Sequence, residues 1–211
     1  GDNSATANVN WGLRRCIEST NVYASSTTTA GEYTYSLTGK GVDIVIQDSG
    51  VDVNHPEWND DNGISRFQVI DWYQASGVSG TQDASFYDDY DGHGTHCAGI
   101  AAGRTYGWAK DAHIYAQKLG GLEGTDDPGN GIPISTSFDT IRLWHNAKTN
   151  GRPTVVNMSW GYSTSYTSDP TGGTYRGTPW TFVAQEDTEL WDDYGIVAPY
   201  NGSNGNDDFR K

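Results

Sequence analysis

The sequence contains little cysteine, few basic side chains and no long apolar run. Two cysteines in 211 residues exclude a fold built on a disulfide framework. Thirteen Lys and Arg against 27 Asp and Glu give a net charge of −14, which argues against nucleic acid or an anionic membrane as the partner, because phosphate groups are bound by basic side chains. No apolar run approaches the roughly 20 residues that span a bilayer. These absences leave a globular protein with an acidic surface.

The length suits one domain with a sizeable core, and the 27 glycines indicate many loops. Residues 1–40 are polar without a strong period, which predicts an N-terminal arm, and residues 41–211 alternate between strand and helix patterns. Strands are expected at 42–47, 112–119, 154–159 and 195–200; helices at 93–102, around 138–145 and from Pro179 to about 193; and loops at 54–91, 120–133 and 162–178.

This alternation predicts right-handed crossovers and a parallel sheet with helices on its faces. Sites in such sheets form at the carboxyl ends of the strands. Asp48 comes one residue after the first predicted strand, Ser159 ends the third, and residues 201–206 follow the fourth. The candidate side chains are therefore expected to converge on one edge of the sheet.

The segment from Asp91 to Gly99 carries the strongest chemical signal. His93 lies between two glycines, which let backbone or substrate approach the imidazole closely, and it opens a predicted helix that would hold the ring in place. Asp91 is expected to order the loop that enters this helix. Such packaging is typical of a catalytic base.

Two motifs in this order, an Asp-Ser-Gly and a His-Gly-Thr-His, resemble the subtilisin-like serine peptidases (subtilases), in which the triad runs Asp, His, Ser along the chain. Three further segments agree with the resemblance, which covers about residues 9 to 207. They are Val51–Trp58 after the aspartate, Val156–Gly161 as the substrate-binding strand, and Ser203–Asp207 around the oxyanion-hole asparagine. The resemblance implies a three-layer α/β fold with a central, mostly parallel sheet.

The resemblance also implies roles for individual residues. His93 is the general base, Asp48 orients it, and an asparagine stabilises the oxyanion. Counting from Gly195 favours Asn204 for that last role, whereas the local Gly-Asn-acid pattern favours Asn206, which we choose. An extended substrate is expected to lie between two backbone edges. These are Ser159, Trp160 and Gly161 on one side and Leu119, Gly120 and Gly121 on the other.

The sequence contains no nucleophilic serine in the context that the family requires. Every Gly-Thr pair is followed by a residue other than serine, and the expected Gly-Thr-Ser would fall beyond Lys211. Residues 1–211 are therefore expected to form an incomplete peptidase domain, whose serine lies on a missing or separate C-terminal fragment of the same protein. Its partners would be that fragment and a polypeptide substrate. The alternative is an inactive pseudo-peptidase that acts as a binding or structural module in a larger assembly.

Metal-dependent hydrolysis by Asp48 and His93 is disfavoured, because the sequence shows no third ligand. Cys97 is expected to be a buried free thiol behind His93, neither nucleophile nor ligand. No cofactor is expected, although calcium is possible in the acidic segment 60–91, since hard cations prefer several oxygen ligands. We expect the protein to be extracellular or part of an extracellular assembly.

Overall fold

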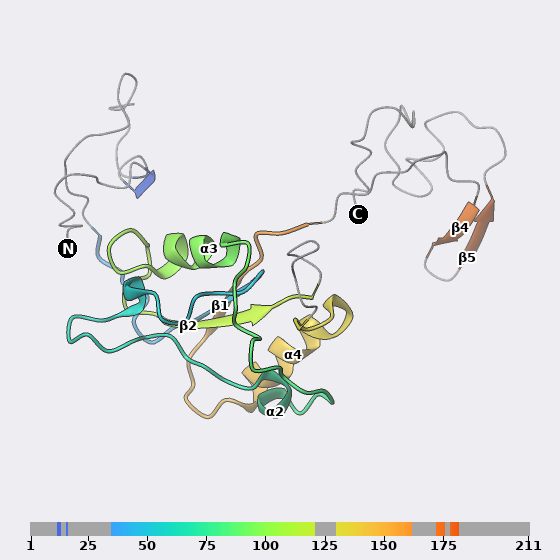
Figure 1. The fold of residues 1–211 in the computed structure, drawn as a ribbon, viewed down its shortest axis with the longest axis horizontal. Helices are drawn as coiled ribbons and strands as arrows, with labels where there is room; N and C mark the ends of the chain where they lie inside the picture. The colour runs from blue at the N-terminus through green and yellow to red at the C-terminus, as the bar shows by residue number, and fades with distance from the viewer. Residues whose placement is uncertain are drawn as a thin grey trace, which may run out of the picture. The chain divides into compact units, whose positions relative to one another are not determined.

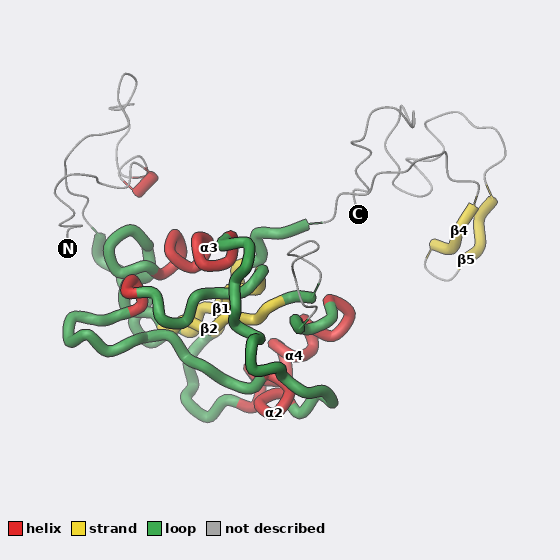
Figure 2. The backbone as a smooth tube through the Cα atoms, viewed as in Figure 1, coloured by secondary structure: helices red, strands yellow, loops and turns green. Residues whose placement is uncertain are grey.

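The computed structural model describes residues 35–120 and 130–161, together with Gly12, Leu13, Cys16 and the segments 172–175 and 178–181. The chain divides into two compact units, residues 1–159 and 160–211, which are described separately. The first unit contains the sheet and its covering helices (Figures 1 and 2).

Three parallel strands form the centre of the first unit. They are β1 (Asp43–Asp48), β2 (His113–Lys118) and β3 (Thr154–Asn157), in the order β2-β1-β3. Every residue of β1 is buried, as expected for a central strand covered on both faces. The predicted parallel sheet is confirmed, and Asp48 is the last residue of β1 rather than the first residue after it.

Helices cover both faces of this sheet. Helix α3 (His93–Ala102) lies on one face, and α2 (Trp72–Ser76) and α4 (Ile134–Ala147) lie on the other (Figure 1). Successive residues of β1 point to opposite faces: Ile44 and Ile46 pack in one core cluster with Ala98 of α3, whereas Val45 packs in the other. The result is the predicted three-layer arrangement.

The acidic segment 54–91 contributes more to the core than its loop-like sequence indicates. It contains the short 3₁₀ helix η1 (Pro56–Trp58) as well as α2, and three of its aromatic side chains are almost fully buried: Trp58, Trp72 and Phe86. This segment connects β1 to α3 in the sequence. Aromatic side chains bury large apolar areas, so the segment is held firmly against the sheet.

The described part of the second unit contains an antiparallel pair, β4 (Gly172–Tyr175) and β5 (Thr178–Thr181). This corrects two predictions, the loop over 162–178 and the helix that begins at Pro179. Pro179 instead lies in β5 opposite Thr174, a position open to proline where its missing N–H is not needed for the ladder. The rest of that helix and the strand predicted at 195–200 lie outside the described residues.

None of the described helices is both long enough and apolar enough to cross a membrane.

Candidate active site

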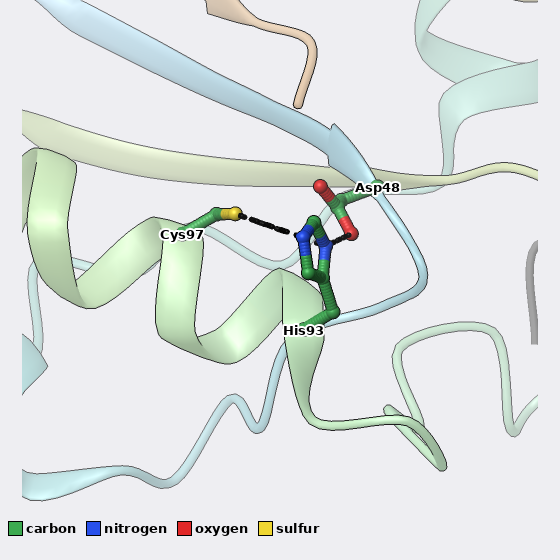
Figure 3. A group of neighbouring side chains, drawn as sticks. All are labelled: Asp48, His93 and Cys97. Atoms are coloured by element: carbon green, nitrogen blue, oxygen red, sulfur yellow. Dashed lines mark hydrogen bonds and ion pairs between the residues drawn. The ribbon is translucent and has the colours of Figure 1, made fainter. Parts of the chain in front are cut away.

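The carboxylate of Asp48 and the imidazole of His93 meet at the carboxyl end of β1. Asp48 ends that strand, His93 begins α3, and Asp48 Oδ1 lies 2.7 Å from His93 Nδ1 (Figure 3). The Asp48 side chain is 2% exposed and that of His93 is 46% exposed. A buried carboxylate thus holds one nitrogen of a ring that solvent can reach, and Nε2 is the nitrogen left to exchange a proton.

The two positions beside His93 require glycine for different structural reasons. Gly92 has a φ of 82°, in the left-handed region that favours glycine, and it turns the chain into α3. Gly94 has no room for a side chain, because a Cβ there would lie 2.0 Å from the carbonyl oxygen of Gly50. The first turn of α3 therefore packs directly on the backbone that follows β1, which brings His93 to Asp48.

Ser49 provides a hydrogen-bonded link between β1 and α3. Its amide donates to Asp48 Oδ1 at 2.8 Å, and its hydroxyl oxygen accepts from the amide of Gly94 at 3.0 Å. The first amides of a helix have no partner within the helix, so Ser49 satisfies one of them from outside. The residues after Asp48 and after His93 are thereby joined.

Asp89 orders the loop that enters α3; the prediction that Asp91 also does so stays a prediction. The Asp89 carboxylate accepts hydrogen bonds from the amides of Gly92 at 3.0 Å and Thr95 at 2.8 Å, and from the hydroxyl of Ser49 at 2.8 Å. Asp89 is half-buried, whereas Asp91 is exposed. Sequence reasoning missed Asp89 because Asp88 and Asp89 read as an ordinary acidic surface pair.

Asp48 raises the pKa of His93 above its usual value. The largest cause is the hydrogen bond that the His93 ring donates to the Asp48 carboxylate, followed by the charge of that carboxylate. Partial burial opposes both, and the charges of Asp91 and Asp89 add smaller effects. Asp48 therefore favours the protonated form of the His93 imidazole, which makes the ring a better proton acceptor.

Cys97 is a free thiol, as predicted, but it is half-buried rather than buried. Its Sγ lies 3.8 Å from Nδ1 and 3.9 Å from Nε2 of His93, one helical turn after that residue (Figure 3). Burial, as the largest cause, raises the pKa of the Cys97 thiol. A thiol that stays protonated is a poor nucleophile.

The cluster corrects one premise of the sequence argument, which found no third ligand beside Asp48 and His93. Cys97 is such a group: one ligand atom from each of the three residues lies within 4.8 Å of the others. Its raised thiol pKa disfavours the thiolate form that binds metals.

The predicted substrate-binding residues differ in what the structure shows of them. Ser159 is exposed, lies two residues after β3, and accepts a hydrogen bond from the side chain of Asn157 at 2.9 Å. Leu119 is buried and donates its amide to the carbonyl oxygen of Asp48 at 2.9 Å, and the amide of Gly120 donates to Ile132 at 3.1 Å. A substrate strand cannot use these two amides without displacing those bonds.

Trp160 and Gly161 belong to the second unit, and Gly121, Asn204 and Asn206 lie outside the described residues. Their proposed roles stay predictions.

Comparisons with known proteins identify the family of this chain. The model of the subtilase family matches residues 39–207, so the chain belongs to that family. Proteinase R of Parengyodontium album is 31% identical over 173 residues, which are 79% of this chain and 37% of that protein. The subtilisin-like serine protease Cur l 4.0101 of Cochliobolus lunatus is 31% identical over 177 residues, 80% of this chain and 32% of that protein.

Among solved structures, a cold adapted subtilisin-like serine proteinase is 27% identical, with a TM-score of 0.46, over 75% of this chain and 48% of that chain. The chain thus spans about a third of the length of these two curated relatives.

Proposed function

We propose that the protein carrying this chain is a subtilisin-like serine endopeptidase, with His93 as the general base and Asp48 as the residue that orients it. The observation that carries the proposal is the 2.7 Å contact between the buried Asp48 carboxylate and the accessible His93 ring. The membership of the chain in the subtilase family supports the same reaction class.

The geometry accounts for each step that these two residues perform. Asp48 accepts a hydrogen bond from the Nδ1–H of His93, which fixes the tautomer and leaves Nε2 as the acceptor of a proton from a serine hydroxyl. The imidazolium that forms is stabilised by the adjacent carboxylate, and Nε2 then returns the proton to the leaving amine.

The serine and the oxyanion donor complete the proposal. We assign the serine to a part of the protein outside residues 1–211, on a C-terminal fragment held in the same fold, and the oxyanion donor to Asn206. The substrate is a polypeptide that pairs with the backbone of residues 159–161. We further propose that the protein acts outside the cell and that the chemical step requires no cofactor.

Proton transfer is favoured over metal-dependent hydrolysis by the pairing of two members of the cluster. Asp48 Oδ1 already binds His93 Nδ1, which places the carboxylate where it orients the imidazole ring.

A fluorophosphonate probe on the natural, full-length protein tests the proposal. We expect labelling of a serine outside residues 1–211, and a loss of labelling rate of about 10⁴-fold in Asp48→Asn, which leaves His93 in the wrong tautomer. Cys97→Ser is the matched control, because it alters the third member of the cluster and should retain most of the rate.

The absence of any labelled serine in the full-length protein would refute the peptidase proposal and favour the pseudo-peptidase. A labelled serine whose reactivity is unaffected by Asp48→Asn would refute the assignment of Asp48.

A further inference from the structure

We propose that Asp89 is a positioning residue that sets the geometry of the Asp48–His93 pair, an inference that rests on the proposed role of His93 as the base. Asp89 touches neither of these two side chains through a hydrogen bond that the structure shows. It acts instead on the residues next to them, at the junction of β1 and α3.

Both oxygens of the Asp89 carboxylate are used, and they bind different elements. Oδ1 accepts from the Ser49 hydroxyl at 2.8 Å and from the Gly92 amide at 3.0 Å. Oδ2 accepts from the Thr95 amide at 2.8 Å and also from the Thr95 hydroxyl. One side chain therefore joins the residue after β1 to the first turn of α3.

Ser49 passes this connection to the neighbour of His93. Its hydroxyl donates to Asp89 and accepts from the Gly94 amide at 3.0 Å. A chain of hydrogen bonds from Asp89 through Ser49 to Gly94 thus runs beside the direct contact between Asp48 and His93. Ser49 follows Asp48 and Gly94 follows His93, so each member of the pair has a sequence neighbour in this series of hydrogen bonds. A shift of Asp89 therefore changes the distance between Asp48 and His93.

The first turn of α3 depends on these bonds because the helix has no cap of its own. The N-cap residue is Gly92, which makes no side-chain capping bond. The free amides of Gly94 and Thr95 are satisfied by Ser49 and Asp89, which lie outside the helix. A carboxylate is also favoured at a helix N-terminus by the helix dipole.

Lys118 anchors the loop that carries Asp89. Its side chain is buried, and Nζ donates to the carbonyl oxygen of Asp88 at 2.6 Å. In the sheet, Lys118 pairs in register with Asp48. The loop that carries Asp89 is therefore attached to β2 at the residue that pairs with Asp48. This attachment makes the Asp89 carboxylate a fixed support rather than a mobile surface group.

The substitution Asp89→Asn tests the proposal in the natural, full-length protein without measuring activity. An asparagine has the same shape, but its amide nitrogen cannot accept a hydrogen bond, so one of the two sides of the junction loses its partners. We expect the pKa of His93, followed by NMR of the imidazole protons, to fall. We also expect one amide, that of Gly92 or that of Thr95, to exchange about fivefold faster, the effect of losing one capping bond.

Asp91→Asn is the matched control, because it removes the same negative charge at a position two residues after Asp89. The charge of Asp91 raises the pKa of His93 more than that of Asp89 does. A positioning role therefore requires a larger fall in Asp89→Asn than in Asp91→Asn. An equal or smaller fall in Asp89→Asn would overturn the proposal, because the charge alone would then account for it.

A second variant covers the case in which Asp89→Asn does not fold. Ser49→Ala breaks the same chain of bonds at its middle and leaves every acidic charge in place. We expect a fall in the pKa of His93 here too, and an unchanged pKa in a folded Ser49→Ala protein would contradict the proposal. In the complete peptidase, Asp89→Asn should lower kcat by about 10- to 100-fold, the effect of a misplaced catalytic group, with little change in KM. Failure of the fluorophosphonate test would leave the pKa comparison intact, so the two proposals fail separately.

Discussion

Substitution of Gly94 by alanine should separate Asp48 from His93 without altering either side chain. A Cβ at this position would lie 2.0 Å from the Gly50 carbonyl oxygen, and Cβ atoms essentially never come closer than 3.0 Å to a non-bonded heavy atom. The start of α3 must therefore retreat by about 1 Å from the end of β1, because both contacting groups are held by backbone. A retreat of that size along the 2.7 Å contact between Asp48 and His93 exceeds the range of a hydrogen bond.

The expected cost of Gly94→Ala is about 1–3 kcal/mol of unfolding free energy, typical of overpacking. For a chain of this size, each kcal/mol lowers Tm by roughly 2–4 °C. The pKa of His93 should fall toward its ordinary value, because the hydrogen bond that raises it most is lost.

Gly99→Ala in the same helix is the control for Gly94→Ala. A Cβ at Gly99 meets nothing within 4 Å, so the substitution should leave the pKa of His93 unchanged and stabilise the helix by about 0.5–1 kcal/mol. Calorimetry and NMR titration measure both quantities. A Gly94→Ala protein with wild-type Tm and wild-type His93 pKa would refute the reasoning.

Three other outcomes follow from the same contacts. Asp48→Asn should lower the pKa of His93. The raised pKa of the wild type stabilises the folded state at pH values below the pKa of an unfolded histidine, and this contribution is lost as the pH rises through the pKa of the folded state. The loss of stability in Asp48→Asn should therefore be larger at about pH 5 than at about pH 8, which urea unfolding checks. Arg66→Met should cost about 3 kcal/mol or more, since it strands the buried carbonyl oxygens of Ala102 and Ala112, whereas Arg142→Ala, which breaks an exposed pair with Asp139, should cost less than about 0.5 kcal/mol. Cys97 should react with a thiol reagent severalfold more slowly than the exposed Cys16, measured in the single-cysteine variants Cys16→Ser and Cys97→Ser, and equal rates would contradict the raised thiol pKa.

The sequence predicted the elements whose pattern is local. The buried run of β1 and the small residues of α3 are recognisable from a few neighbours, so their bounds differ from the predicted ones by a residue or less. Pro179 was assigned to a helix because proline suits a first helical turn, but the antiparallel pairing of β5 with β4 decides its conformation. That pairing is a contact between two segments, and a local pattern does not contain it.

The residues that carry the proposed chemistry were predictable, whereas those that hold them in place were not. Asp48 and His93 stand in specific motifs. Asp89, Arg66 and Lys118 stand in none, because their roles come from bonds to residues far away in the chain: Asp89 to Ser49, Arg66 to Ala102 and Ala112, and Lys118 to Asp88. An acidic pair or a single arginine in a loop normally indicates a solvated surface.

The segment between Asp48 and His93 is therefore part of the site, although the structure assigns no proton transfer to it. Buried Trp58, Trp72 and Phe86 fix it on the core, and the amide of Val51 donates to Tyr87 at 3.0 Å where the segment returns to β1. Substitutions near Asp89 should then change how well the pair is aligned and leave its chemistry the same. In the complete peptidase such variants would lower kcat while keeping a His93-dependent pH profile, whereas substitution of His93 itself would abolish that profile.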